Sequence, residues 1–324
     1  MPDIVCLGEA LIDLVSSDVG MGLIESHVFE KAAGGAPTNV AAGIAILGAS
    51  SGLIAKVGDD HFGQYLKQTL ADCEVDLANF VLTPDYATQL AFVAIGPNGV
   101  PDFAFHVKQS ADQMLTAAEI DPKYLADAAI FHFGSITLIN EPVRSATLHA
   151  LQLATDAGSL ISFDPNLRPP LWPDLDTARK VMLDTIPSCD VLKIADAEAV
   201  FLTGRDDVEE AAQQLYDMGP ALVAVTLGAA GCYFIGDTGH GGVKGFEVPV
   251  DDTVGCGDAF VAGMLVYLLE SERDVSELTL NELEELFRFA NATGALTATG
   301  KGAIPSMPHR DEVLEMLEEA ERKA

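Results

Sequence analysis

The stretch DDTVGCGDAFVAGMLVYLL, residues 251–269, joins a glycine-rich turn directly to an apolar helix pattern. Glycine allows backbone conformations closed to other residues and lets a ligand approach closely. A helix that begins here leaves its first N–H groups without intrahelical acceptors, and these groups together with the helix dipole attract an anion. Asp258 then stands in the first turn, beside the anion. The pattern suits phosphoryl transfer, in which amides hold the phosphoryl group and a carboxylate accepts a proton.

The same turn is also compatible with a purely structural role. An acidic residue in a first helical turn serves the helix dipole without any ligand, and the spacing alone leaves this possibility open. The sequence has no GxxxxGK[ST] loop, and GEALID at residues 8–13 is not GxGxxG, so neither a P-loop nor a Rossmann site is indicated. Cys256 has no evident histidine partner, which favours a small core residue over a nucleophile.

Short apolar runs alternate with helical patterns along most of the chain. Strands are predicted at Ile4–Leu7, Ser51–Val57, Ala129–Phe133, Leu160–Asp164, Val191–Ile194 and Leu222–Thr226. Helices are predicted at Thr38–Leu47, Phe62–Asp72, Glu141–Ala157, Leu175–Ile186, Asp196–Leu202, Val208–Met218, Asp258–Leu269 and Asn281–Thr299. Continuously apolar strands are typical of strands covered on both faces. We therefore expect a three-layer α/β fold, with a mainly parallel central sheet between helices.

Two segments interrupt this alternation. Phe29–Ala33 leads into a glycine pair, and Thr88–Val107 resembles a hairpin that turns at Pro97–Gly99. We expect a small separate β-sheet from approximately residues 14–34 and 88–112, covering the mouth of the site as a lid. A shorter hairpin is predicted around Cys232–Glu247. No linker separates two domains, so residues 1–324 are expected to form a single domain that carries the lid.

A second glycine turn, GGAPTNVA at residues 34–41, also precedes a predicted helix. Asn39 in its first turn and Asp13, predicted at the end of the first strand, would form a polar pocket. A carboxylate accepts hydrogen bonds and an amide both donates and accepts them, which suits sugar hydroxyls. Helix capping and a tight turn would account for the same residues without a ligand.

The composition limits the partners and the compartment. The chain carries 49 acidic and 18 basic residues, a net charge of −31, which repels nucleic acids and anionic lipid surfaces. Its five cysteines are odd in number and lack CxxC spacing, so reduced thiols are expected. The N-terminal stretch has no basic region typical of a signal peptide, and no apolar run is long enough to span a bilayer. We therefore expect a cytoplasmic protein without nucleic-acid or membrane partners.

The two glycine turns together resemble the paired signatures of the ribokinase-like (phosphofructokinase-B type) carbohydrate kinases, in the same order and spacing over nearly the whole chain. Within that family FDPNLRPPLW at residues 163–172, with GEALID and GSITLI at residues 134–139, is most similar to fructokinases. The resemblance implies ATP-dependent phosphorylation of a primary hydroxyl on a free sugar, D-fructose giving fructose 6-phosphate. It also implies Mg²⁺ and K⁺ as cofactors.

The resemblance also implies roles for individual residues. Asp258 is the catalytic base, and Arg168 lies near the substrate or the transferring phosphate. The amides of the anion hole are those of Gly255, Cys256 and Gly257. The sugar is held by Asp13, Gly34, Gly35 and Asn39. The nucleotide contacts are Lys193, Glu198, Thr226, Gly228, Gly231, Asn291 and Ala295, with Glu198 placing Mg²⁺ through water. The monovalent cation site comprises Asp252 and Val254 with Gly302 and Ser306 of the loop at residues 300–306.

Several alternatives stay open at this point. Arg168 could form a surface ion pair, Glu198 could be an ordinary first-turn carboxylate, and Asn291 could be a satisfied polar group in a packed helix. The family often has asparagine where Ala195 stands and arginine where Val107 stands. The rival substrates are 2-keto-3-deoxygluconate, ribose and a nucleoside, and a catalytically silent sugar-binding regulatory protein is the rival of another class. The edge strands of the lid could pair two copies into a homodimer.

Overall fold

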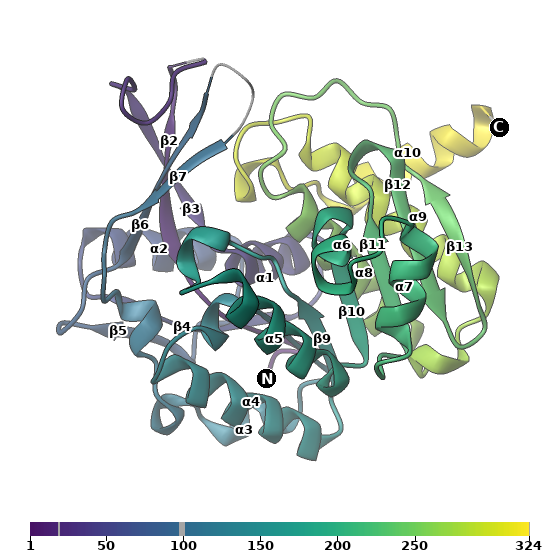
Figure 1. The fold of residues 1–324 in the computed structure, drawn as a ribbon, viewed down its shortest axis with the longest axis horizontal. Coiled ribbons are helices and arrows are strands. Elements are labelled where there is room, and N and C mark those ends of the chain that lie inside the picture. The colour runs from purple at the N-terminus through teal and green to yellow at the C-terminus, as the bar shows by residue number, and fades with distance from the viewer. Residues whose placement is uncertain (19, 97–100, 324) are drawn as a thin grey trace.

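A nine-stranded sheet forms the centre of the computed structural model, which describes residues 1–18, 20–96 and 101–323 (Figure 1). Its order is β13-β12-β11-β10-β9-β8-β1-β4-β5. The strands are β1 (Ile4–Leu7), β4 (Ser51–Gly58), β5 (Phe80–Thr83), β8 (Ile130–Gly134), β9 (Leu160–Asp164), β10 (Val191–Ala195), β11 (Leu222–Thr226), β12 (Gly231–Gly236) and β13 (Gly239–Lys244). Neighbours from β5 to β11 are parallel, and β12 and β13 are antiparallel additions at the edge. The mainly parallel sheet is as predicted.

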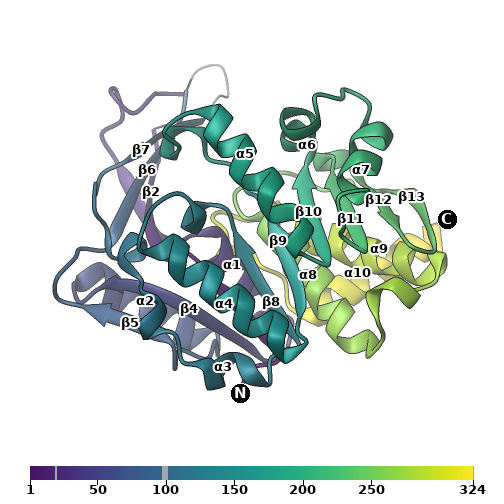
Figure 2. The same ribbon diagram turned by 60° about the horizontal axis from the view of Figure 1, so that its bottom comes forward.

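Helices cover both faces of this sheet (Figure 2). Alternate side chains of β1 enter separate apolar cores, because successive residues of a strand point to opposite faces. The core that contains Ile4 and Cys6 is completed by α1 (Ala36–Ile46), α2 (His61–Asp72), α8 (Cys256–Ser271), α9 (Leu280–Thr297) and α10 (Arg310–Lys323). The core that contains Val5 and Leu7 is completed by α3 (Pro122–Ala126), α4 (Val143–Ala157), α5 (Leu175–Thr185), α6 (Asp196–Thr203) and α7 (Val208–Tyr216). The three-layer prediction is thus confirmed.

A separate four-stranded sheet, the lid sheet, stands at the upper left of Figure 1. Its strands, in the order β3-β2-β6-β7, are β2 (Leu11–Ser16), β3 (Phe29–Gly34), β6 (Gln89–Ile95) and β7 (Pro101–Phe105). The predicted hairpin is formed by β6 and β7, and its turn at Pro97–Gly99 lies outside the described residues. The prediction of a small separate sheet is confirmed.

Two details of the sequence prediction are wrong. The first lid strand begins at Leu11 rather than near residue 14, and Asp13 lies on this strand instead of at the end of β1. The reason is that residues 8–10 interrupt what looks like one continuous apolar run, and the chain leaves the central sheet there. The edge strand β5 and the last helix, α10, were not predicted.

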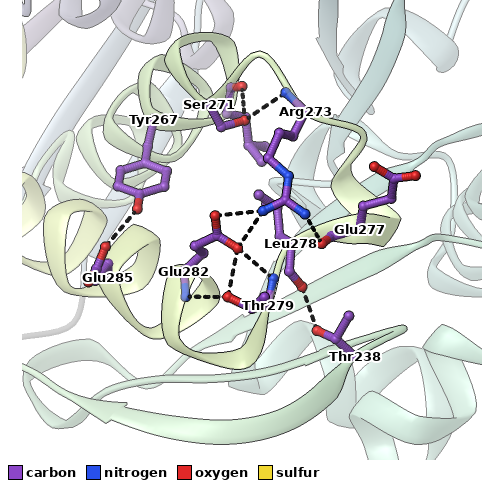
Figure 3. Close-up of polar contacts among 10 residues, drawn as sticks. Thr238, Tyr267, Ser271, Arg273, Glu277, Leu278, Thr279, Glu282 and Glu285 are labelled. Carbon is purple, nitrogen blue, oxygen red and sulfur yellow. Dashed lines mark hydrogen bonds and ion pairs between the residues drawn. The ribbon is translucent and has the colours of Figure 1, made fainter.

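A polar cluster fixes the connection between α8 and α9, as Figure 3 shows. The Arg273 guanidinium donates to both carboxylate oxygens of Glu282, at 2.7 and 2.8 Å, and to the carbonyl oxygen of Glu277 at 2.7 Å. Thr279 and Glu282 form a capping box at the start of α9. These bonds, the hydroxyl of Thr279 first, lower the pKa of Glu282 to about 2. The cluster therefore ties the loop that follows α8 to the first turn of α9.

None of the helices formed by the described residues has the length and apolarity needed to cross a bilayer.

Candidate active site

Two cavities meet at the N-terminus of α8. The lid cavity, about 260 Å³, lies between the lid sheet, α1 and α8, whereas the edge cavity, about 470 Å³, lies between α8, α9 and the strands β11 to β13. Thr253 and Gly257 line both. A further cavity of about 1130 Å³ opens near the amino ends of β8 to β11. Since ligands of parallel sheets bind outside the carboxyl ends of the strands, we place the candidate site in the first two cavities.

The first turn of α8 forms the wall between the two cavities. Gly255 precedes the helix with a φ of 81°, and a Cβ there would lie 2.4 Å from the Cβ of Ala303, so only glycine fits. The amide of Cys256 makes a long hydrogen bond of 3.4 Å to Thr253 O. The ammonium of Lys193 lies 3.3 Å from the position that a Cβ on Gly257 would take. Helix amides and a cation therefore face the same point, which favours an anion.

Cys256 lies on this wall rather than in the core, and is only half-buried. Burial, with the nearby carboxylates of Asp252 and Asp258, raises the pKa of its thiol to about 11. A thiol that stays protonated at neutral pH is a poor nucleophile, as expected from the sequence. The expectation that Cys256 belongs to the core is wrong, because the residue lines the edge cavity.

Asp258 projects from the same turn and is 8% exposed. Its Oδ2 accepts a hydrogen bond of 2.8 Å from Asn39 Nδ2, and its Oδ1 accepts one of 3.3 Å from Asn166 Nδ2. Burial raises the pKa of the carboxyl to about 6, against the opposing effect of the Asn39 hydrogen bond. The group is thus ionised near neutral pH and oriented by two amides on the wall of the lid cavity, as a general base requires.

The predicted sugar-binding residues converge on the lid cavity. Asp13, Gly35 and Asn39 line it, and Gly34 leaves room for Asp13, because a Cβ there would lie 2.0 Å from the Asp13 carboxylate. Burial raises the pKa of Asp13 to about 7, partly offset by the guanidinium of Arg168. The cavity therefore offers a carboxyl and an amide to hydroxyl groups.

Arg168 also lines the lid cavity and donates to Leu167 O at 3.3 Å. Within the described residues it makes no ion pair, so the surface ion-pair alternative finds no partner. Its guanidinium supplies positive potential in a protein whose net charge is −31. An anionic ligand of this chain needs such a cation.

Glu198 lies at the start of α6, where its two carboxylate oxygens accept the backbone amides of Leu167 and Ala195. It thus orders two backbone segments, as expected of a first-turn carboxylate. Each oxygen keeps a further lone pair that could accept from a metal-bound water. Among the described residues no three carboxylate, imidazole or thiol groups gather at a metal-binding point.

The predicted nucleotide-binding residues other than Lys193 and Glu198 line the edge cavity: Thr226, Gly228, Gly231, Asn291 and Ala295. The amide nitrogen of Asn291 already donates to Val243 O at 3.2 Å and to Lys244 O at 3.4 Å. It is a satisfied polar group that also borders the cavity. The mostly apolar lining suits a planar base.

The predicted monovalent cation site consists of two loops joined by Asp252. Its carboxylate accepts the amides of Val254 and Gly302, each at 3.0 Å. Ser306 closes its own loop by donating to Lys301 O at 2.9 Å. The four predicted residues therefore belong to one pair of tied loops beside the anion-binding turn, and K⁺ at this place stays a prediction.

Sequence reasoning missed three residues that matter here. Asn166 donates to Asp258, Asp164 pairs with Lys193, and Glu9 accepts the amide of Ala36 at 3.0 Å at the start of α1. The first two stand in FDPNLRPPLW, a stretch that indicated only the likeness to fructokinases. An acidic residue two positions before asparagine is a typical turn pattern and could have drawn attention to them.

Comparisons with known proteins agree with this geometry. The sequence profile described as pfkB family carbohydrate kinase matches residues 1–310. Fructokinase-1 of Oryza sativa subsp. japonica is 43% identical over 318 residues, which cover 98% of each chain. The crystal structure of fructokinase with bound ATP from Xylella fastidiosa superimposes with a TM-score of 0.90 at 32% identity, covering 99% of this chain and 100% of that one. A fructokinase double mutant from Vibrio cholerae O395, in its fructose, ADP and potassium ion bound form, gives a TM-score of 0.86 at 33% identity over 97% and 98% of the two chains. The family profile covers residues 1–310, and the relatives match over nearly the full length of the chain. The chain therefore belongs to the pfkB family of carbohydrate kinases.

Proposed function

We propose that this protein transfers the γ-phosphoryl group of ATP to the primary hydroxyl of D-fructose, giving fructose 6-phosphate. The observation that carries the proposal is the place of Asp258, held by two amides between the lid cavity and the anion-binding turn. The fructokinases that resemble this chain, including those whose structures hold ATP or fructose with ADP, support this choice of substrates.

The sugar would lie in the lid cavity. Asp13, Asn39 and Arg168 offer it hydrogen bonds, and the lid strands contribute Val15, Ala91, Val93, Phe103 and Phe105 as apolar lining. A sheet that covers the sugar excludes water, which would otherwise compete as the nucleophile.

The nucleotide would extend from the edge cavity, with its terminal phosphate at the wall formed by Gly255–Gly257. Asp258 is ionised at neutral pH, but a sugar hydroxyl is a far weaker acid, so proton transfer should accompany bond formation. Positioning and charge stabilisation by the α8 amides, Lys193 and Arg168 then supply most of the rate. Mg²⁺, held chiefly by phosphate oxygens and reached by Glu198 through water, would neutralise charge on the phosphates.

A substrate panel tests the proposal. Wild-type protein with Mg-ATP is offered fructose, 2-keto-3-deoxygluconate, ribose and adenosine, and ADP release is measured. Fructose should give the highest kcat/KM. A preference for 2-keto-3-deoxygluconate would instead assign Arg168 and Lys108 to a substrate carboxylate. Fructose binding without any ADP release would support the catalytically silent alternative.

We further infer that residues 1–324 act as one kinase domain and that two copies associate through the lid. Three large apolar side chains on the segment between β2 and β3 are exposed: Met21 (44%), Ile24 (94%) and Val28 (54%). Exposed apolar side chains that precede the open edge strand β3 favour a second copy as partner. Light scattering should show a dimer for the wild type and a monomer for Ile24→Lys.

The cell compartment and the absence of nucleic-acid partners are also inferences. Five free thiols, three of them buried, are consistent with a reducing cytoplasm. The net charge of −31 opposes binding to nucleic acids.

A further inference from the structure

The carboxylate of Asp164, at the carboxyl end of β9, makes two contacts inside the site. It is 3% exposed. Oδ2 forms an ion pair of 2.9 Å with Lys193 Nζ on the neighbouring strand β10. Oδ1 accepts the backbone amide of Asn166 at 3.1 Å. Both oxygens thus hold groups that adjoin the reaction centre, although Asp164 itself is absent from the cavity linings.

The first contact holds a cation. Lys193 is 5% exposed, lines the lid cavity and places its ammonium beside Gly257. Burial opposes protonation, but Asp164, Glu198 and Asp258 together raise the pKa of Lys193, so it stays charged. One of its three protons is used by Asp164. The ammonium is thereby directed at the anion-binding turn of α8 instead of swinging freely on its four-carbon stem.

The second contact holds a turn. Asn166 has a φ of 45°, a left-handed conformation that asparagine tolerates better than most residues. The Asp164 carboxylate fixes this conformation through the Asn166 amide, as in an Asx turn. The side chain of Asn166 then reaches Asp258 Oδ1 at 3.3 Å.

We propose that Asp164 is a positioning residue that aligns the phosphate-side cation Lys193 and, through Asn166, the base Asp258 around the transferring group. The inference rests on the proposed kinase function and assigns no chemistry to Asp164 itself. The alternative is that the buried pair only contributes to stability, since buried ion pairs are common without any catalytic role. If Asp164 positions Lys193, the effects of replacing the two residues on turnover are coupled. If the pair contributes only to stability, they are not.

A double-mutant cycle decides between them. Asp164→Asn, Lys193→Met and the double variant are assayed for kcat and for the KM of ATP and sugar, with the best sugar of the panel. Asp164→Asn should lower kcat by about 10²-fold, the scale of a small misplacement in a reaction centre. In the Lys193→Met background, Asp164→Asn should lower kcat by less than about threefold, because the effects of residues that act as a unit are not additive. Full additivity in an active enzyme overturns the proposal.

Two further variants separate a catalytic effect from a loss of folding. Asn166→Gly tolerates the left-handed turn but lacks the side chain that donates to Asp258, and it should lower kcat by about tenfold, with an unchanged melting temperature. An unchanged kcat in that variant contradicts the second contact even if Asp164→Asn does not fold. Glu119→Gln breaks the partly buried Lys56–Glu119 pair, 2.7 Å long and outside both cavity linings, and should change the melting temperature but not kcat. If the wild type releases no ADP with any sugar, the proposed function itself fails, an outcome distinct from an additive cycle.

Discussion

The side-chain amide of Asn39 donates a hydrogen bond of 2.8 Å to Asp258, across 219 positions of sequence. The bond joins the first turn of α1 to the first turn of α8. Close packing of the two helices makes it possible, because a Cβ on Gly43 of α1 would lie only 2.9 Å from the Cβ of Ala262 on α8. The two glycine-rich turns are therefore parts of one site.

Replacing the base tests the reaction centre. Asp258→Asn keeps the size of the side chain and removes its ability to accept a proton. We expect kcat to fall by about 10²–10⁴, the usual contribution of a positioned base, while ATP affinity measured by calorimetry changes little. Asp251→Asn, an exposed neighbour outside the cavity linings, is the matched control. A kcat within about threefold of the wild type would remove Asp258 from this role.

The pH dependence should reveal the buried carboxyls. The pKa of Asp258 is raised to about 6 and that of Asp13 to about 7. Asp258 must be ionised to accept a proton, and ionised Asp13 can accept hydrogen bonds from sugar hydroxyls with both oxygens. The kcat/KM for fructose should therefore fall as the pH drops through this range. The Asn39 hydrogen bond lowers the pKa of Asp258, so Asn39→Ala should move the acid limb to higher pH. An acid limb that stays in place would show that Asp258 does not control it.

Replacing Gly34 should impair the use of the sugar and leave the binding of ATP nearly unchanged. Gly34→Ala places a Cβ 2.0 Å from the Asp13 carboxylate, which must then move. We expect kcat/KM for fructose to fall by about 10²-fold with the KM for ATP nearly constant, since only the lid cavity changes. Gly242→Ala on β13, where the added Cβ lies 3.9 Å from its nearest neighbour, is the control. Equal losses for both substrates would point to general unfolding.

Potassium should act through Asp252. We expect turnover to be faster in KCl than in NaCl at equal ionic strength, because the tied loops adjoin the anion-binding turn. Asp252→Ala releases the amides of Val254 and Gly302 and should make the two salts equivalent. A wild type that does not distinguish the salts would contradict K⁺ at this place.

Salt should also stabilise the protein by general screening of its charge. A net charge of −31 destabilises the compact state through self-repulsion. Raising the salt from about 0.1 M to about 1 M shortens the screening length from about 10 Å to about 3 Å. The melting temperature should therefore rise with NaCl concentration. A melting temperature that falls with salt would show that attractive surface pairs outweigh the repulsion.

Local patterns in the sequence determined much of this protein. Apolar runs predicted the strands of the parallel sheet except β5, and glycine-rich turns before helices predicted both turns of the site. Backbone freedom and helix-end amides are properties of a few neighbouring residues. The tertiary structure alone placed Asp13 on the lid, paired Asp164 with Lys193 and brought Asn39 and Asn166 to Asp258. These contacts depend on how distant helices and strands pack and on where the chain leaves one sheet for another. Such long-range geometry is set by the whole core and leaves no periodic signal in any single stretch of the chain.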